Sequence, residues 1–328
     1  MNCTGNLRIP WLILLALMTP VALVLTGGAA EPGPEIIRVG IMQGSMDGPA
    51  VNDAKAATKV WMESIFSEQV GHAVLPEVQM YANRAAIAVA LERKTADLLV
   101  MGTADFYALG GTATFDRVFL YSRGGEVAER YLLLVRADSG IESLASVRGR
   151  KLILLDNVRA DLAERWLDSR LKQDGLPVVR HLAQEVVVER KSSRCIQRVF
   201  FRNADACLVT AQAYRTAVEL NPQLGRQLTV LAKSPPYVPS VIAIPANFTA
   251  AVRPTLEQGI LTAHTKPKGQ QVLRVYRIDR LVRQSGEELT SAKALLAETG
   301  EAGGKAPKAP KAPTASQHPP ARGEESPQ

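Results

Sequence analysis

The strongest constraint on the fold is an alternation of short apolar runs with helical segments between residues 36 and 298. Strands are expected at 36–41, 74–80, 96–102, 131–135, 151–155, 185–189, 206–210 and 241–244. Helices are expected at 54–69, 84–94, 141–147, 159–173, 192–201 and 254–264. Apolar runs of strand length, separated by segments with apolar residues at helical spacing, are typical of α/β proteins. Because the strand–helix–strand order occurs twice, the sequence predicts two parallel-rich sheets covered by helices.

The two ends of the chain lie outside this pattern. An apolar run at 11–25 follows Arg8, and small residues lead from it to Ala30. This order predicts an export signal over residues 1–30, cleaved after Ala30. An uncleaved signal anchor is the alternative, although the run is short for a membrane span. Residues 299–328 contain three Lys-Ala-Pro triplets and almost nothing to bury, so they predict an extended or disordered tail.

Composition and motifs exclude several classes of function. The net charge of +7 comes from 39 basic and 32 acidic residues that are spread along the chain rather than clustered on one segment. Aromatic residues, at 5%, are too sparse for a base-stacking platform, so we expect no nucleic-acid partner. The four histidines lack metal-ligand spacing, and phosphate-loop, zinc-protease and serine-hydrolase motifs are absent from the sequence. We therefore expect no metal, no cofactor and no enzymatic activity.

Two cysteines remain if the export signal is removed. Cys195 lies on an expected helix and Cys207 on the strand that follows it. In an oxidising compartment the two would form a disulfide if the helix packs back over the strand. The alternative is two buried thiols that act as small hydrophobic side chains.

Hydrogen-bonding residues follow the expected strands. In open α/β sheets, ligands bind beyond the carboxyl ends of the parallel strands. The loops at these ends are 42–48, 102–107, 156–159 and 210–214, and the first of them contributes Gln43 and Asp47 as candidate ligand contacts. Several of these loops precede expected helices, whose first N–H groups suit a carboxylate or a phosphate.

Four stretches, in this order, resemble the periplasmic solute-binding proteins of phosphonate-type ABC transporters. They are 37–42, 95–108, 131–151 and 199–209, the last followed by Ser-Pro-Pro at 234–236. The third stretch is the most specific, since it combines a strand, an Asp-Ser-Gly-Ile turn, a short helix and a basic turn. The resemblance runs over about residues 36–281.

This resemblance implies a two-lobed type II periplasmic-binding-protein fold. Each lobe would hold a parallel-rich sheet flanked by helices, and two crossing strands would join the lobes. The first lobe would comprise residues 36–125 and 236–285, and the second lobe residues 126–235. A ligand would bind in the cleft and draw the lobes together.

The resemblance also implies a function in solute uptake. The chain would be periplasmic, would capture a small anionic or zwitterionic ligand (phosphonate-like, phosphate-like or a carboxylate), and would deliver it to the membrane permease of an ABC transporter. One alternative is a sensory or interaction protein that keeps the binding fold, has lost transport, and acts with a membrane sensor. A third reading, an enzyme on a similar scaffold, has no nominated catalytic pair in the sequence.

The ligand contacts of the family carry over to both lobes. They are Thr103, Asp105 and Tyr107 in the first lobe and Asn157 and Arg159 in the second, with Thr210 and Tyr237 nearby. Asp105 stands where the family commonly has serine, and 156–161 replaces a Ser/Thr-rich turn. Arg159 would bind a carboxylate or sulfonate and Asp105 an amino group, so a zwitterion would suit both. The alternatives are that Asp105 caps the following helix and that Arg159 is solvated.

Overall fold

The computed structural model describes residues 35–45, 51–66 and 74–300. The predicted export signal (1–30), the candidate contact Asp47 and the tail beyond Gly300 lie outside the described residues. Among the residues that are described, no helix is long and apolar enough to cross a membrane.

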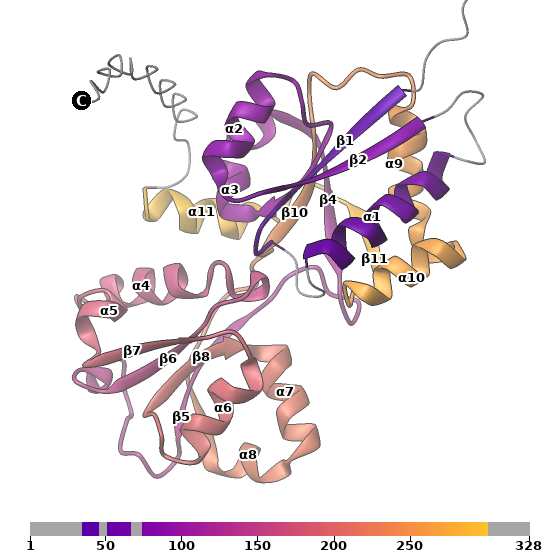
Figure 1. Ribbon diagram of the computed structural model, residues 1–328. Helices are drawn as coiled ribbons and strands as arrows, with labels where there is room; N and C mark the ends of the chain where they lie inside the picture. Colours follow the sequence, from indigo (N-terminus) through magenta and orange to yellow (C-terminus); the bar gives the residue numbers. More distant parts are fainter. Residues whose placement is uncertain (1–34, 46–50, 67–73, 301–328) are drawn as a thin grey trace, which may run out of the picture. The chain divides into compact units, whose positions relative to one another are not determined.

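The first of two sheets has six strands. They are β1 (Glu35–Met42), β2 (Val74–Tyr81), β3 (Leu98–Gly102), β4 (Phe115–Ser122), β10 (Ser240–Pro245) and β11 (Arg280–Arg283). Their spatial order is β11-β4-β10-β3-β1-β2 (Figure 1). β1 runs parallel to β2 and β3, whereas β10 is antiparallel to both β3 and β4, and β11 is antiparallel to β4. All five residues of β3 are buried, as expected for a central strand with both faces covered.

Helices cover both faces of this sheet, and we call the assembly the first lobe (Figure 1). One face carries α1 (Val51–Phe66), α9 (Arg253–Thr262), α10 (Pro267–Val275) and the 3₁₀ turn η4 (Ala263–Thr265). The other face carries α2 (Arg84–Glu92), α3 (Thr103–Ala108) and the 3₁₀ turn η1 (Gly111–Ala113). Asn83 caps α2, because its side-chain oxygen accepts a 3.0 Å hydrogen bond from the N–H of Ala86.

The second sheet has five strands and forms the second lobe. They are β5 (Tyr131–Arg136), β6 (Lys151–Leu155), β7 (Glu185–Glu189), β8 (Ala206–Thr210) and β9 (Leu228–Lys233), in the spatial order β7-β6-β8-β5-β9. β6 is parallel to β7 and β8, whereas β5 is antiparallel to β8 and β9. Figure 1 shows α4 (Ala163–Gln173) and α5 (Val179–Leu182) on one face, and α6 (Ser192–Phe200), α7 (Ala211–Leu220) and α8 (Pro222–Gln227) on the other. The 3₁₀ turns η2 (Ala145–Val147) and η3 (Val158–Ala160) complete this lobe.

The chain crosses between the sheets after β4 and again before β10. The two crossing segments pair through one antiparallel bridge, in which Glu129 and Tyr237 exchange backbone hydrogen bonds of 2.7 and 2.8 Å. The last helix, α11 (Thr290–Glu298), follows β11 of the first sheet. Its residues Ala292, Leu295 and Leu296 nevertheless lie in the hydrophobic core of the second lobe.

The predicted α/β class with two lobes is confirmed, and the sheets are mixed rather than uniformly parallel. The parallel part of each sheet is a set of three strands, β2-β1-β3 and β7-β6-β8. The sequence analysis did not predict β4, β9, β11, α5, α7, α8, α10 or α11. Of the helix expected at 141–147, only 145–147 is helical, and most of the loop expected at 102–107 is α3.

Candidate functional site

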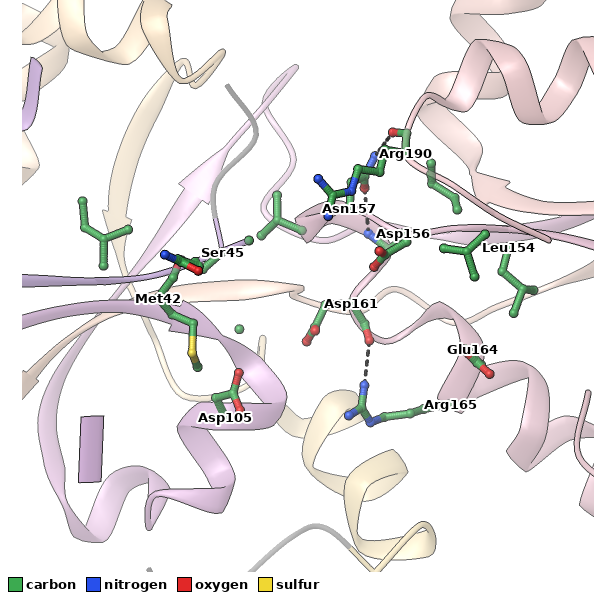
Figure 2. Close-up of a pocket in the computed structure, with 18 of the residues that line it drawn as sticks. Met42, Ser45, Asp105, Leu154, Asp156, Asn157, Asp161, Glu164, Arg165 and Arg190 are labelled. Atoms are coloured by element: carbon green, nitrogen blue, oxygen red, sulfur yellow. Dashed lines mark hydrogen bonds between the residues drawn. The ribbon is translucent and has the colours of Figure 1, made fainter. Parts of the chain in front are cut away.

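A cavity of about 900 Å³ is lined by residues of both lobes (Figure 2). The first lobe contributes the end of β1 with the turn that follows it, Met80 of β2, Gly102 of β3 and Asp105 of α3. The second lobe contributes the end of β6, η3, the start of α4, and residues of α5 and β7. The cavity therefore lies at the carboxyl ends of the parallel strands, where the sequence analysis expected a ligand.

On the first-lobe wall, Asp105 is held by an arginine. Its Oδ1 accepts a 2.9 Å hydrogen bond from Nε of Arg84, at the start of α2. Asp105 does not cap α3, because that helix begins after Gly102 and has no side-chain cap. Gln43 also lines this wall, and its backbone N–H donates to the carbonyl of Tyr81 over 2.9 Å.

On the second-lobe wall, Asn157 caps the turn η3. Its Oδ1 accepts hydrogen bonds from the N–H groups of Arg159 (3.1 Å) and Ala160 (3.2 Å). Its Nδ2 donates to the carbonyl of Arg190 over 3.4 Å. The two N–H groups that a ligand oxyanion would use at this turn are therefore already bonded to a side chain of the protein.

Charged side chains of both signs surround the cavity. Four carboxylates and three guanidinium groups line it: Asp105, Asp156, Asp161, Glu164, Arg165, Arg180 and Arg190. Arg180 makes a two-pronged contact with Glu164, with Nε–Oε1 of 2.5 Å and Nη2–Oε2 of 2.9 Å, and this carboxylate raises the pKa of Arg180. Arg165 donates from Nη1 to the backbone carbonyl of Asp161 over 2.9 Å. The cavity wall therefore offers both carboxylate acceptors and guanidinium donors to a ligand.

Arg159, the predicted anion-binding residue, makes its contacts within the protein. Its Nε donates to Oε1 of Glu129 over 2.6 Å, and its Nη2 donates to Oε1 of Gln212 over 2.7 Å. These bonds tie η3 to a crossing segment and to α7. Arg159 is therefore not solvated, and it is not among the residues that line the cavity.

The other predicted contacts are divided between the cavity and the interior. Gln43, Asp105 and Asn157 come together at the cavity, whereas Thr103, Tyr107, Thr210 and Tyr237 are not part of its lining.

The side chains that do not line the cavity are packed inside the protein, and three of them contact other residues there. Thr103 is fully buried, and Tyr107, whose pKa is raised by burial, donates to the carbonyl of Leu289 over 3.4 Å. Thr210 caps α7 through a 3.2 Å bond from the N–H of Ala213. Tyr237 stacks on Tyr131, with the ring centroids 5.9 Å apart.

Sequence reasoning missed Asp161, Glu164, Arg165, Arg180 and Arg190. The first three belong to the helix expected at 159–173, but the chain forms the separate elements η3 and α4 there. The break between these elements brings the three side chains to the cavity wall (Figure 2). Arg180 lies on the four-residue helix α5, which is too short to show a helical period in the sequence.

The two cysteines are free, buried thiols in the structure, so the disulfide considered above is not formed. Burial raises the pKa of Cys195 to about 12 and also raises the pKa of Cys207. Within the described part of the chain, no group of three or more His, Cys, Asp and Glu side chains is arranged to hold a metal ion.

Comparison with known proteins establishes the family. The family model described as the periplasmic substrate-binding protein of phosphonate ABC transporters matches residues 55–289, well over half of the chain. The chain belongs to this family. The predicted resemblance is thereby confirmed. No curated protein matches the chain significantly.

Solved structures share the fold of this phosphonate-type binding protein at low sequence identity. XAC2383 from Xanthomonas citri, bound to ATP, has a TM-score of 0.60 at 16% identity over 82% of this chain and 97% of that chain. PhnD1 from Prochlorococcus marinus, in complex with methylphosphonate, has a TM-score of 0.56 at 14% identity over 82% of this chain and 100% of that chain. A binding protein component of a phosphonate ABC transporter from Pseudomonas aeruginosa has a TM-score of 0.54 at 15% identity, over 82% and 88%. At these identities the likeness concerns the fold alone.

Membership fixes the general class of activity. The family consists of periplasmic substrate-binding proteins of ABC transporters, so the chain is a binding protein rather than an enzyme. Proteins of this family bind small molecules and deliver them to a permease. The match gives no support to the sensory alternative.

Proposed function

We propose that this protein captures a small zwitterionic or anionic solute in the cavity between its lobes and delivers it to the permease of an ABC transporter. The ligand would carry a phosphonate, phosphate-like or carboxylate group. The observation that carries this proposal is the cavity of about 900 Å³, which takes charged side chains from both lobes. Pockets of this size bury most of the surface of a small ligand.

The placement of the cavity provides a mechanism for capture. A ligand that contacts Asp105 of the first lobe and Asn157 of the second lobe at once binds the closed arrangement better than an open one. Such a difference in affinity shifts the population of the protein toward closure. The lobes in this proposal are residues 36–125 with 236–285 and residues 126–235.

The predicted contacts take two roles in this proposal. Gln43, Asp105 and Asn157 touch the ligand. Asp47, which comes shortly after β1 in the sequence, touches it as well. Thr103, Tyr107, Arg159, Thr210 and Tyr237 act as positioning residues. Arg159 is the clearest case, because its bonds to Glu129 and Gln212 fix the turn that carries Asn157.

Thermal shift followed by titration calorimetry tests the proposal. The panel contains methylphosphonate, an aminoalkylphosphonate, phosphate, a sulfonate, amino acids, dicarboxylates and ATP. A true ligand raises the melting temperature in proportion to the logarithm of its concentration once the site is saturated. The shift should be lost in Asp105→Asn and retained in Glu92→Gln, a control at an exposed acid on α2. A flat response from well-folded protein across the panel would contradict solute capture.

The export step has a separate test. We propose that residues 1–30 direct export to the periplasm and are removed after Ala30. Mass spectrometry of the protein recovered from the periplasm should give a chain that begins at Glu31. A chain that begins at Met1 and sediments with membranes would favour the signal anchor instead.

A further inference from the structure

We propose that the outer side of α6, in the second lobe, binds the anionic phospholipid headgroups of a membrane surface. The residues of this surface, which we call the α6 face, are Lys191, Arg194, Gln197, Arg198, Phe201 and Asn203. The inference goes beyond the proposed function, because none of these six residues lines the cavity between the lobes. It names the surface by which the protein would stay near a membrane permease.

The helix α6 separates apolar from basic side chains. Cys195, Ile196 and Val199 are at most 1% exposed and belong to the core of the second lobe. On the other side, Arg198 follows Arg194 by four residues, so these two side chains lie next to each other. Figure 1 shows α6 beside α7 on one face of the second sheet. An amphipathic helix with basic residues on its polar side is typical of segments that lie on a membrane surface.

The α6 face carries a shallow cavity of about 300 Å³. It is lined by two guanidinium groups, two amide side chains and one phenyl ring, which belong to Arg194, Arg198, Gln197, Asn203 and Phe201. Among the described residues that line this cavity, none is a carboxylate. Guanidinium groups bind phosphate oxygens through paired N–H donors, and side-chain amides add further donors. The cavity therefore offers hydrogen-bond donors to a phosphate group without a negative charge on its wall.

Two acids pair with the arginines of this region, and each is shared among several donors. Oε2 of Glu189 is 3.9 Å from Nη1 of Arg194, which is beyond a hydrogen bond. Oε1 of Glu189 accepts instead from the backbone N–H groups of the next two residues, at 3.1 and 2.9 Å, and these bonds lower the pKa of Glu189. Asp138 binds Arg136 through both carboxylate oxygens and also accepts from Arg202. Neither acid therefore neutralises the cavity on the α6 face.

The basic groups of the α6 face remain available to a partner. Arg194 is 61% exposed, and Arg198 makes no side-chain hydrogen bond or ion pair within the described chain. Lys191 is exposed at the start of the helix, whereas Arg190 before it lines the cavity between the lobes. The α6 face thus keeps a positive charge, which attracts an anionic surface.

Phe201 favours a lipid over a free anion as the partner. Its side chain is 64% exposed at the edge of the cavity that the arginines line, and its ring meets that of Phe200 edge-on, with the centroids 5.0 Å apart. A free phosphate would account for the arginines but not for an apolar ring that is left in water. A bilayer accounts for both, because its phosphates meet the guanidinium groups and its interface takes up the aromatic ring.

Vesicle flotation of the purified protein tests this assignment. The probes are vesicles of phosphatidylcholine and vesicles that also contain about one third phosphatidylglycerol, an anionic lipid. We expect binding to the anionic vesicles to be about tenfold tighter or more, and the double variant Arg194→Gln, Arg198→Gln should lose most of this preference. The preference should also fall when NaCl is raised from about 0.05 to 0.5 M, since salt screens exposed charges. Phe201→Ala should weaken binding by about threefold and keep the salt dependence.

The double variant Arg274→Gln, Arg280→Gln is the matched control, since it removes the same charge from two exposed arginines of the first lobe. All these proteins share the same terminal segments, and a melting curve checks that each is folded. The assignment is overturned if the control loses the preference as the α6 variant does, or if the wild type binds both kinds of vesicle equally. Tighter binding to polyglutamate than to the anionic vesicles would overturn it in favour of an acidic protein partner. Solute capture is tested separately by the thermal-shift panel, so either proposal can fail without the other.

Discussion

Each lobe has an aspartate that joins a central strand to its parallel neighbour through two hydrogen bonds. In the first lobe, Asp97 precedes β3, donates its N–H to the carbonyl of Arg38 on β1 (2.8 Å), and accepts at Oδ2 from the N–H of Arg38 (2.8 Å). In the second lobe, Asp205 precedes β8 and makes the same pair of contacts with Lys151 on β6, at 2.9 and 2.8 Å. Each aspartate thus fixes the start of a central strand against its parallel neighbour.

The lobes differ in how deeply they bury this aspartate. The side chain of Asp97 is 12% exposed, whereas that of Asp205 is 37% exposed. Burial raises the pKa of Asp97 despite the opposing hydrogen bond and charge of Arg38. The same contacts therefore carry a desolvation penalty in the first lobe that the second lobe largely avoids.

The cores are also closed in different ways. The six-stranded sheet has a separate hydrophobic cluster on each face, and both are built mainly from its own elements. The second-lobe cluster is completed by Ala292, Leu295 and Leu296 of α11, a helix that reaches it from the first lobe. Ser169 of α4 also donates to Oε2 of Glu298 over 2.6 Å. The core of the second lobe therefore depends on a segment distant in sequence, whereas α11 places none of its described residues in the two hydrophobic clusters of the first sheet.

The largest expected effect tests this dependence. Leu296 is 0% exposed, so Leu296→Ala should lower the free energy of unfolding by about 2–5 kcal/mol through lost burial and a cavity. Leu220→Ala on α7 is the control: Leu220 is 82% exposed, and its loss should cost less than about 0.5 kcal/mol. Urea unfolding measures both, and hydrogen exchange should show faster opening of β8 than of β3 in Leu296→Ala. Equal costs for the two leucines would mean that α11 does not close the second core.

The next effect compares the two aspartates directly. Asp97→Ala leaves the N–H of Arg38 without its carboxylate in a buried place, which should cost about 1–3 kcal/mol. In Asp205→Ala, water can reach the N–H of Lys151 more easily than it reaches the N–H of Arg38 in Asp97→Ala. We therefore expect a smaller loss of stability, about 0.5–1.5 kcal/mol. Urea unfolding of the two variants checks the order. A larger loss of unfolding free energy in Asp205→Ala than in Asp97→Ala would show that burial does not decide how much this aspartate stabilises its lobe.

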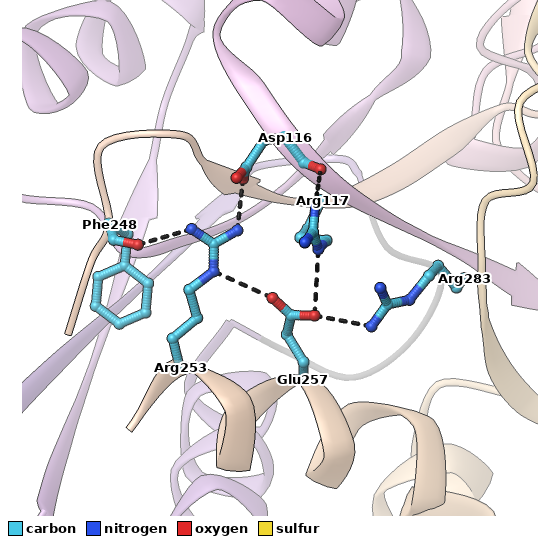
Figure 3. Close-up of polar contacts among 6 residues, drawn as sticks. All are labelled: Asp116, Arg117, Phe248, Arg253, Glu257 and Arg283. Carbon is cyan, nitrogen blue, oxygen red and sulfur yellow. Dashed lines mark hydrogen bonds and ion pairs between the residues drawn. The ribbon is translucent and has the colours of Figure 1, made fainter. Parts of the chain in front are cut away.

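A third comparison concerns ion pairs. In the first lobe, Glu257 is 13% exposed and binds three arginines, with 2.8 Å to Arg283, 3.1 Å to Arg253 and 3.4 Å to Arg117 (Figure 3). Arg253 also donates to Oδ1 of Asp116 over 2.6 Å. Glu257→Gln should therefore cost about 1–2 kcal/mol, less than the loss of a fully buried pair.

Glu164→Gln in the second lobe is the matched change. Glu164 is 35% exposed, and among the described residues its ion pair is with Arg180, so its loss should cost less than about 1 kcal/mol. Both variants are measured by thermal unfolding at low and at high salt. If the Glu257 variant loses no more stability than the Glu164 variant at low salt, the network adds nothing beyond a single pair.

Two of the strands that were predicted correctly, β3 and β8, show why an apolar run is a strong signal. β3 and β8 are buried along their whole length, so their sequences carry a strong signal. β11 is a four-residue strand at the sheet edge with arginine at both ends, and its pattern is too short to separate from a loop. For α11 the signal was present, since Ala292, Leu295 and Leu296 are spaced as one buried helical face.

The site was predictable only where it follows from topology. Gln43, Asp105 and Asn157 lie just after parallel strands, and the strand-end rule places such residues at a ligand site. The same rule could not show that Arg159 turns to Glu129, because that contact joins a turn to a crossing segment 30 residues away. Nor could it place Arg180, whose contact with Glu164 depends on how α5 packs beside α4. Direction of a side chain at a strand end is decided by tertiary partners.

The smallest effect concerns Asp97 and depends on pH. Because the folded-state pKa of Asp97 is raised above its ordinary value, the folded protein binds a proton at this site more readily than the unfolded chain. Stability contributed by Asp97 therefore falls as pH rises from the ordinary carboxyl value through the raised one, and it recovers on acidification. Asp97→Asn keeps an oxygen acceptor for the N–H of Arg38 and has no such titration. The wild type should thus gain stability relative to Asp97→Asn as the pH is lowered from 7 toward 4, measured by urea unfolding at each pH. A difference between the wild type and Asp97→Asn that stays constant over this pH range would show that burial does not raise the pKa of Asp97.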